Sequence, residues 1–166
     1  MPPGGQPSPL RGRLALFRSS LAPCLTLWQR YGSSAVNLVS AAEGSAARLV
    51  NILARDFACF RDEHIYEGRT KPVRFLKRAQ ILVADLWACF NGESYGEFHD
   101  IDKITIFADY RIPQILISLG ALYCSPTVAA AIKDKQLLES GGRWEMQLRG
   151  ELISYQPTSD DQLTRR

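Results

Sequence analysis

The sequence predicts a mostly α-helical fold, with a single helical domain over residues 21–152 and at most one or two short strands. Three observations favour this class. Apolar residues recur at helical spacing in several segments, most clearly between residues 75 and 90. Serines, glycines and prolines stand where such segments would begin and end. The 166 residues also contain no internal repeat and no glycine-rich phosphate-binding motif, which disfavours a nucleotide-binding α/β fold.

The amino-terminal third predicts three short helices. Residues 1–20 are rich in Pro, Gly, Ser and Arg, so we expect a disordered head. Residues 21–31 are expected to form the first helix, and each of the next two helices is preceded by a serine that can cap it. The capping serines and the glycines that end helices are expected to be Gly32, Ser33 or Ser34, Gly44 and Ser45.

The middle of the chain predicts a loop followed by the clearest helix. Residues 58–74 are polar and contain Gly68 and Pro72, so we expect a surface loop. The next segment, Phe75 to Phe90, has one apolar stripe that we expect to lie in the core. The stripe consists of Phe75, Ala79, Leu82, Val83, Leu86, Trp87 and Phe90.

The carboxy-terminal part predicts two helices and a strand. Pro113 disfavours a helical residue before it, so the first helix should cover 114–119. A serine and a proline predict a second helix that runs to about Leu138. Apolar and polar residues alternate over 143–152, which favours a short strand. Residues 153–166 lack periodicity and are expected to be a disordered tail.

Composition and cysteine spacing limit the kinds of ligand and compartment. The net charge of +3 suits a small anionic ligand but is too mild for a dense nucleic-acid-binding face. Four cysteines lie at least thirty residues apart, which predicts neither a zinc site nor a disulfide framework. Each has apolar neighbours, so we expect Cys24, Cys59, Cys89 and Cys124 to be small core residues in a reducing compartment. The longest apolar runs are too short to span a bilayer.

The first 42 residues contain arginine and serine but no Asp or Glu, a pattern that resembles a mitochondrial transit peptide. Four prolines among the first nine residues oppose the amphipathic helix of such a peptide. We therefore expect a cytoplasmic protein and keep a mitochondrial location as the alternative.

A dense polar cluster lies between Phe107 and Gln114, where Asp109, Tyr110 and Arg111 follow one another beside a predicted helix start. Two interpretations stay open from the residues alone. The carboxylate and the guanidinium can form an ion pair that fixes the helix entry. Alternatively, charged groups beside helix N–H donors can bind a ligand.

The segment FADYRIPQIL resembles the queuosine salvage family, the queuosine 5′-phosphate N-glycosylase/hydrolases. Further segments fit this family in the same order, and the likeness extends from about Trp28 to Gly150. These segments are GSSAVNLV at 32–39, GSAARLVNIL at 44–53, FRDEHIYEGR at 60–69, FLKRAQILVADLW at 75–87 and GEFHDIDKIT at 96–105. The resemblance implies a fold similar to that of helical DNA glycosylases. It also implies a cofactor-free enzyme that releases queuine from queuosine 5′-monophosphate for tRNA modification.

The implied reaction selects the candidate site residues. Hydrolysis of an N-glycosidic bond develops positive charge on the sugar, which a carboxylate stabilises. Within the resemblance, Asp109 is the expected catalytic carboxylate. Lys77 and Arg78 are expected to bind the 5′-phosphate, with Arg111 in reserve. The substrate-binding residues that the resemblance implies are Phe107, Tyr110, Arg111, Gln114, Lys77 and Arg78.

Members of the family are about twice as long as this chain, with additional regions at both ends. We therefore expect a truncated member with little hydrolase activity of its own. The alternative is a non-catalytic remnant that acts as an interaction module, and a helical nucleic-acid-binding module is a third interpretation. The expected partner is a small nucleotide, without direct nucleic acid or membrane binding.

Overall fold

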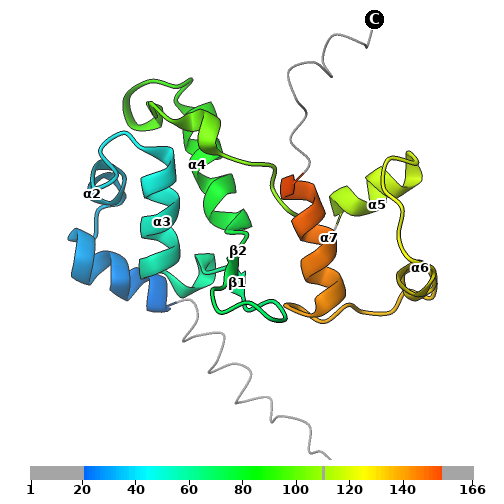
Figure 1. Cartoon of the computed structure of the whole chain (residues 1–166). Helices are drawn as coiled ribbons and strands as arrows, with labels where there is room; N and C mark the ends of the chain where they lie inside the picture. Colours follow the sequence, from blue (N-terminus) through cyan, green and yellow to red (C-terminus); the bar gives the residue numbers. More distant parts are fainter. Residues whose placement is uncertain (1–20, 110, 155–166) are drawn as a thin grey trace, which may run out of the picture. The chain divides into compact units, whose positions relative to one another are not determined.

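A computed structural model describes residues 21–109 and 111–154, including only the backbone of the last two, and this part of the chain is mostly α-helical (Figure 1). The predicted fold class is confirmed. The predicted disordered head, Tyr110 and the tail from residue 155 lie outside the described residues. The predicted tail was to begin at residue 153, but the helical backbone continues to Ser154. None of the described helices is long and apolar enough to cross a membrane.

The described residues fall into two compact units, and each unit is built from two separate chain segments. Unit 1 contains residues 21–61 and 79–104. Unit 2 contains residues 62–78 together with the described residues from Thr105 onward. The single domain over 21–152 stays a prediction.

Unit 1 is formed by helices with short 3-10 turns between them. Residues 21–31 are helical, as predicted. The other elements are α2 (Ala35–Ser40), α3 (Ala46–Asp56), η1 (Ala58–Phe60), the part of α4 (Lys77–Cys89) from Ala79 onward, η2 (Ser94–Gly96) and η3 (Ile101–Lys103). Both predicted serine caps are present. Ser34 Oγ accepts from the Asn37 N–H at 3.3 Å, and Ser45 Oγ accepts from the Arg48 N–H at 3.1 Å.

A buried carboxylate completes the start of α3. Asp100 is 4% exposed, and its Oδ1 accepts from the Ala46 N–H at 2.6 Å. Its Oδ2 accepts from Ser45 Oγ at 2.8 Å. Burial by itself raises the pKa of Asp100, but these hydrogen bonds outweigh it and hold the pKa below its usual value. Asp100 thereby joins the second segment of unit 1 to the first, and it has a structural role.

The apolar stripe predicted for α4 is wrong at its carboxy-terminal end. Trp87 and Phe90 are 44% and 40% exposed, whereas the buried residues of the helix are Ala79, Gln80 and Val83. Helical spacing defines which residues share a face, but it does not define where that face leaves the core. Here the Phe90 ring instead makes an edge contact with Tyr95, with ring centroids 5.7 Å apart.

The prediction that the cysteines are core residues is wrong for three of the four. Cys24, Cys59 and Cys89 are exposed, and Cys124 is partly buried. Successive helical residues point about 100° apart, so apolar neighbours in sequence say little about the face on which a cysteine lies.

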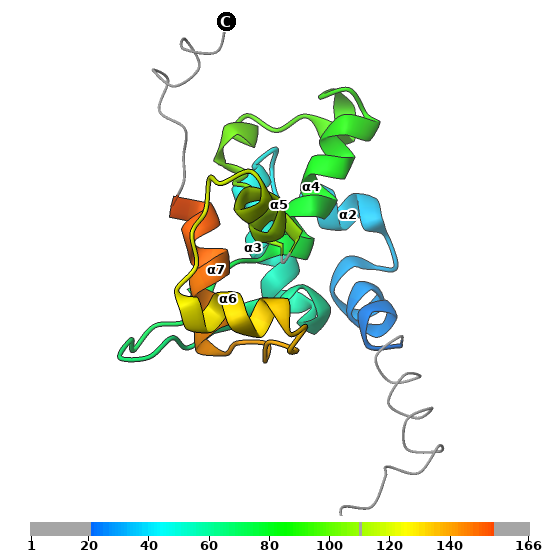
Figure 2. The ribbon, with the colours of Figure 1, turned by 90° about the vertical axis from the view of Figure 1, so that its right-hand side faces the viewer.

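Unit 2 begins with a two-stranded antiparallel sheet. β1 (Glu63–His64) pairs with β2 (Val73–Arg74), so that Glu63 lies opposite Arg74 and His64 opposite Val73. Both strands lie within the segment that was predicted to be a loop. The other elements of this unit are α5 (Arg111–Ser118), α6 (Pro126–Lys133) and α7 (Arg143–Ser154), and Figure 2 turns α5 and α6 toward the viewer.

The strand predicted over 143–152 is wrong, because this segment forms α7. Its buried side chains are Met146, Arg149 and Leu152, which are three residues apart and share one helix face. The sequence prediction compared only apolar residues, and the buried arginine hid this spacing. Because Arg149 is charged, the apolar residues alone did not show the helical spacing of the buried positions.

Two helix ends also differ from prediction. α5 begins at Arg111, so Pro113 lies within its first turn and the residues before it are helical. A proline is tolerated there because the first four N–H groups of a helix have no intrahelical partner. α6 starts after the predicted Ser125 cap but ends at Lys133 rather than at about Leu138. Two residues later, Lys135 has a left-handed backbone with φ +54°.

The core of unit 2 brings β2, α5 and α7 together. Phe75, Ala108, Met146 and Leu152 form its buried centre, and the partly buried residues around it are Tyr66, Val73, Ile112 and Leu116. The turn before α7 requires glycine, since Gly141 has φ +77° and a Cβ atom there would lie 2.4 Å from His64 Nδ1. The hairpin and the turn before α7 thus approach each other closely at His64 and Gly141.

Candidate active site

A buried arginine on α7, Arg149, lies at the centre of the polar cluster of unit 2. Its side chain is 9% exposed, and the guanidinium lies over the Phe75 ring at 4.0 Å from the centroid. Nε donates to the carbonyl oxygen of Ala108 at 3.0 Å. The Nη atoms donate to both carboxylate oxygens of Asp62 and to Glu145 Oε1. Paired carboxylates and a fixed carbonyl thus offset the cost of burying this cation.

Asp62 stands between Arg149 and the start of α4. Its Oδ2 accepts from the Lys77 N–H at 3.2 Å, in addition to the bonds from the guanidinium. Burial alone raises the pKa of Asp62, but the hydrogen bonds from Arg149 and Lys77 prevail and lower it. In turn, burial lowers the pKa of Arg149, while Asp62 and Glu145 raise it overall. Asp62 and Arg149 are therefore both charged at neutral pH.

The predicted catalytic residue Asp109 forms an ion pair with Lys77. Lys77 Nζ lies 2.7 Å from Asp109 Oδ2, and the two side chains are 27% and 24% exposed. Asp109 directly follows Ala108, whose carbonyl Arg149 holds. A pair at this depth is less screened by water than a surface pair. The structure therefore brings together two residues that the sequence places 32 positions apart.

The other predicted substrate-binding residues differ from one another in exposure. Arg78 and Arg111 are exposed, and Phe107 is half-buried. Gln114 is exposed on α5 and contributes to a pocket. Tyr110 lies outside the described residues. Their roles toward a substrate stay predictions.

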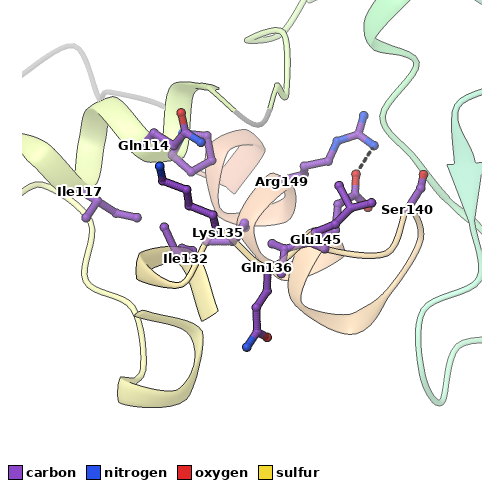
Figure 3. Close-up of a pocket in the computed structure, with 12 residues that line it drawn as sticks. Gln114, Ile117, Ile132, Lys135, Gln136, Ser140, Glu145 and Arg149 are labelled. Carbon is purple, nitrogen blue, oxygen red and sulfur yellow. Dashed lines mark hydrogen bonds and ion pairs between the residues drawn. The ribbon is translucent and has the colours of Figure 1, made fainter. Parts of the chain in front are cut away.

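A pocket of about 550 Å³ lies among α5, α6, α7 and the segment that precedes α7 (Figure 3). This volume falls within the range of small-molecule sites. Its walls are mainly apolar, and Gln114, Glu145 and Arg149 contribute polar groups. Asp109 is not among the lining residues, so the pocket and the Lys77–Asp109 pair are separate features of unit 2. Arg149 contributes to both, since it lines the pocket and holds the carbonyl next to Asp109.

The sequence interpretation missed Asp62, Glu145 and Arg149. Asp62 lies within the segment FRDEHIYEGR, and Arg149 lies at the end of the resemblance, but neither was assigned a role. Arg149 lies at helical spacing between the apolar residues Met146 and Leu152. A charged residue at such a core position is the sequence signal that would have indicated a buried ion pair. Among the described residues, no group of three His, Cys, Asp or Glu side chains could hold a metal ion.

Comparison with known proteins assigns the family. The family model described as queuosine salvage protein matches residues 9–163. The chain belongs to the queuosine salvage protein family. The family resemblance inferred from the segments quoted above is confirmed.

Similar members of the queuosine salvage family carry the name queuosine 5′-phosphate N-glycosylase/hydrolase. The Schizosaccharomyces pombe protein is 42% identical over 141 residues, covering 85% of this chain and 39% of the relative. The Mus musculus protein is 42% identical over 124 residues, or 75% of this chain and 36% of the relative. The Sphaerobacter thermophilus protein is 38% identical over 127 residues, which cover 76% of this chain and 39% of the relative. The chain spans less than two fifths of the length of these relatives.

Proposed function

We propose that the protein hydrolyses the N-glycosidic bond of queuosine 5′-monophosphate and releases queuine. One observation carries this proposal: the Lys77–Asp109 ion pair, which lies half-buried in a chain about 40% identical to N-glycosylase/hydrolases of that nucleotide. We further propose that the reaction takes place in the cytoplasm and supplies queuine for tRNA modification.

Asp109 has the charge that this reaction requires. As the bond between the anomeric carbon and the base breaks, its electron pair leaves with the base and positive charge grows on the sugar. The carboxylate of Asp109 stabilises that charge and orients the attacking water. The water oxygen bonds to the anomeric carbon, and a proton from this water ends on the released base. Lys77 holds the carboxylate in place through its contact of 2.7 Å.

The 5′-phosphate needs cations near Asp109, and Lys77 contacts that carboxylate. Arg78 is the next residue on α4 and is exposed, and Arg111 is exposed at the start of α5. We assign the phosphate to these arginines, since a guanidinium binds phosphate oxygens through two parallel hydrogen bonds. Phe107, Tyr110 and Gln114 are assigned to the base and sugar.

The test is incubation of the protein with queuosine 5′-monophosphate and detection of free queuine by mass spectrometry. The wild-type chain should release queuine, and the Asp109→Asn variant should release far less. Glu63→Gln is a matched control, because it removes a carboxylate whose ion pair is with Arg74 of the hairpin. Equal release by the wild type and Asp109→Asn would refute the assignment.

A second function, a non-catalytic binding module, is favoured by the pocket of about 550 Å³ in unit 2, whose lining residues do not include Asp109. The same experiment separates the two proposals. A chain that binds queuosine 5′-monophosphate in calorimetry, yet releases no queuine over hours, would support the binding module.

A further inference from the structure

We infer that Asp62 is a positioning residue for Asp109, which it holds indirectly through Lys77 and through Arg149. This inference rests on the proposed function only where it concerns turnover. The contacts that carry it lie within unit 2, and they reach Asp109 from two directions.

The first direction runs through the start of α4. The main-chain oxygen of Asp62 accepts from the N–H groups of Phe75 and Leu76, at 3.0 and 3.2 Å. Its carboxylate accepts from the next N–H, that of Lys77. Asp62 thus binds three successive N–H groups. They lie at a sharp turn, since Leu76 has a left-handed backbone with φ +50°.

This turn fixes the position from which the Lys77 side chain extends. The ammonium group must then reach Asp109 through side-chain torsions alone, and it does so at 2.7 Å. A long lysine side chain loses rotamer freedom when it is held in one position. A fixed backbone at Lys77 removes one source of motion, so the ammonium group spends more time on the carboxylate.

The second direction runs through α7. Asp62 holds the guanidinium of Arg149 by two parallel hydrogen bonds. The remaining edge of that guanidinium donates to the carbonyl of Ala108, directly before Asp109. The planar guanidinium has a rigid donor geometry, so its orientation toward Asp62 also sets its orientation toward Ala108. Asp62 is the residue that both directions share.

Positioning of this kind matters because small displacements are costly. A catalytic group must be held within about 0.5 Å of its productive geometry, and a displacement of about 1 Å can lower a rate by about a hundredfold. Asp62→Asn preserves the size of the side chain and its acceptor for the Lys77 N–H. It removes the charge and the second acceptor oxygen that orient Arg149.

Two independent measurements test the inference on the whole chain. The first is the acylation rate of Lys77 by a water-soluble succinimidyl ester, followed by peptide mass spectrometry with Lys71 as the internal reference. We expect Asp62→Asn to raise Lys77 acylation several-fold, in the direction of Asp109→Asn, and to leave Lys71 unchanged. The second is queuine release, where we expect kcat to fall at least about tenfold and KM to change by less than about twofold.

Matched variants separate positioning from loss of fold. Asp62→Glu restores the charge and should recover part of kcat, whereas Glu63→Gln should behave as wild type. If Asp62→Asn melts early, Arg149→Lys tests the second direction alone, because a lysine keeps a positive charge but cannot bind Asp62 and Ala108 together. This variant should also lower kcat with little change in KM.

The outcomes distinguish this inference from the proposed function. Unchanged Lys77 acylation in Asp62→Asn, or unchanged kcat in an active protein, overturns the positioning role. Raised acylation in a chain that releases no queuine supports the positioning role and refutes the proposed hydrolysis by this chain.

Discussion

The ammonium group of Lys77 lies 2.7 Å from Asp109 Oδ2 and so joins the first residue of α4 to the residue two positions before α5. The sequence predicted that Lys77 binds the substrate's phosphate, and that role stays a prediction. From the ion pair we propose a second role for Lys77, which is to orient the carboxylate that would meet the sugar cation.

Replacement of Asp109 by asparagine should abolish most queuine release. The amide keeps the shape of the side chain but removes the charge that stabilises the developing cation, so we expect a loss of at least about a hundredfold. Steady-state release, measured by mass spectrometry, tests this loss, and circular dichroism confirms that the variant folds. Near-normal turnover in a folded Asp109→Asn variant would end the catalytic assignment.

Replacement of Lys77 and of Arg78 by alanine should have different effects. Lys77→Ala should lower turnover of the monophosphate and of the free nucleoside alike, because it acts through Asp109. Arg78→Ala should weaken binding of the monophosphate much more than binding of the nucleoside. Queuine release and calorimetric affinity, measured for both variants with both ligands, decide the matter. If Lys77→Ala instead weakens the monophosphate selectively, the phosphate role predicted from the sequence is correct.

Acid should destabilise unit 1 through Asp56 at the end of α3. Hydrogen bonds from Arg55 have the largest effect and lower the pKa of Asp56, whereas burial raises it. Tyr31 and Arg30 lower it further, so that the pKa is about 2. A lowered pKa in the folded state stabilises the protein above the unfolded pKa of about 3.9, and this stability is lost as the pH falls toward 2. The contribution is roughly 2 kcal/mol at neutral pH.

Urea unfolding of the wild type and Asp56→Asn at pH 6 and pH 3 measures this contribution. The wild type should lose more unfolding free energy than the variant over this interval. Glu43→Gln is the control, since Glu43 is 70% exposed in its pair with Arg48. The same pH dependence in Asp56→Asn and wild type would show that other carboxylates control acid unfolding.

The chain by itself should be marginally stable. Unit 2 leaves Ile115, Leu119, Tyr123 and Leu137 between 56% and 98% exposed. Each apolar side chain of this size gains about 1.5–3 kcal/mol when it is fully buried, and a whole domain is stable by only about 5–15 kcal/mol. We expect a broad thermal transition and slow queuine release, and a longer chain that covers these side chains should improve both. A sharp melt above about 45 °C, with full turnover, would contradict this.

Local signals predicted most of the helices, and long-range contacts account for most errors. Ser34, Ser45 and Ser125 cap helices as expected because a capping serine acts within three residues of itself. The strand predicted in place of α7 failed because the buried Arg149 is compensated by a carboxylate from a distant segment. The catalytic role of Asp109 was inferred from a local family motif and stays a prediction. The partnership of Asp109 with Lys77 depends on folding and could not be read from local sequence.

The bond between Arg149 and Asp62 spans 87 positions of the chain, and this separation affects the order of events during synthesis. Asp62 leaves the ribosome long before its partner, at a pace of about 5–20 residues per second, so the 87 residues require roughly 4–17 s. Until α7 emerges, the carboxylate of Asp62 lacks its main counter-charge. The nascent chain can therefore assemble its early helices, but the surroundings of Asp109 are completed only after α7 has been synthesised.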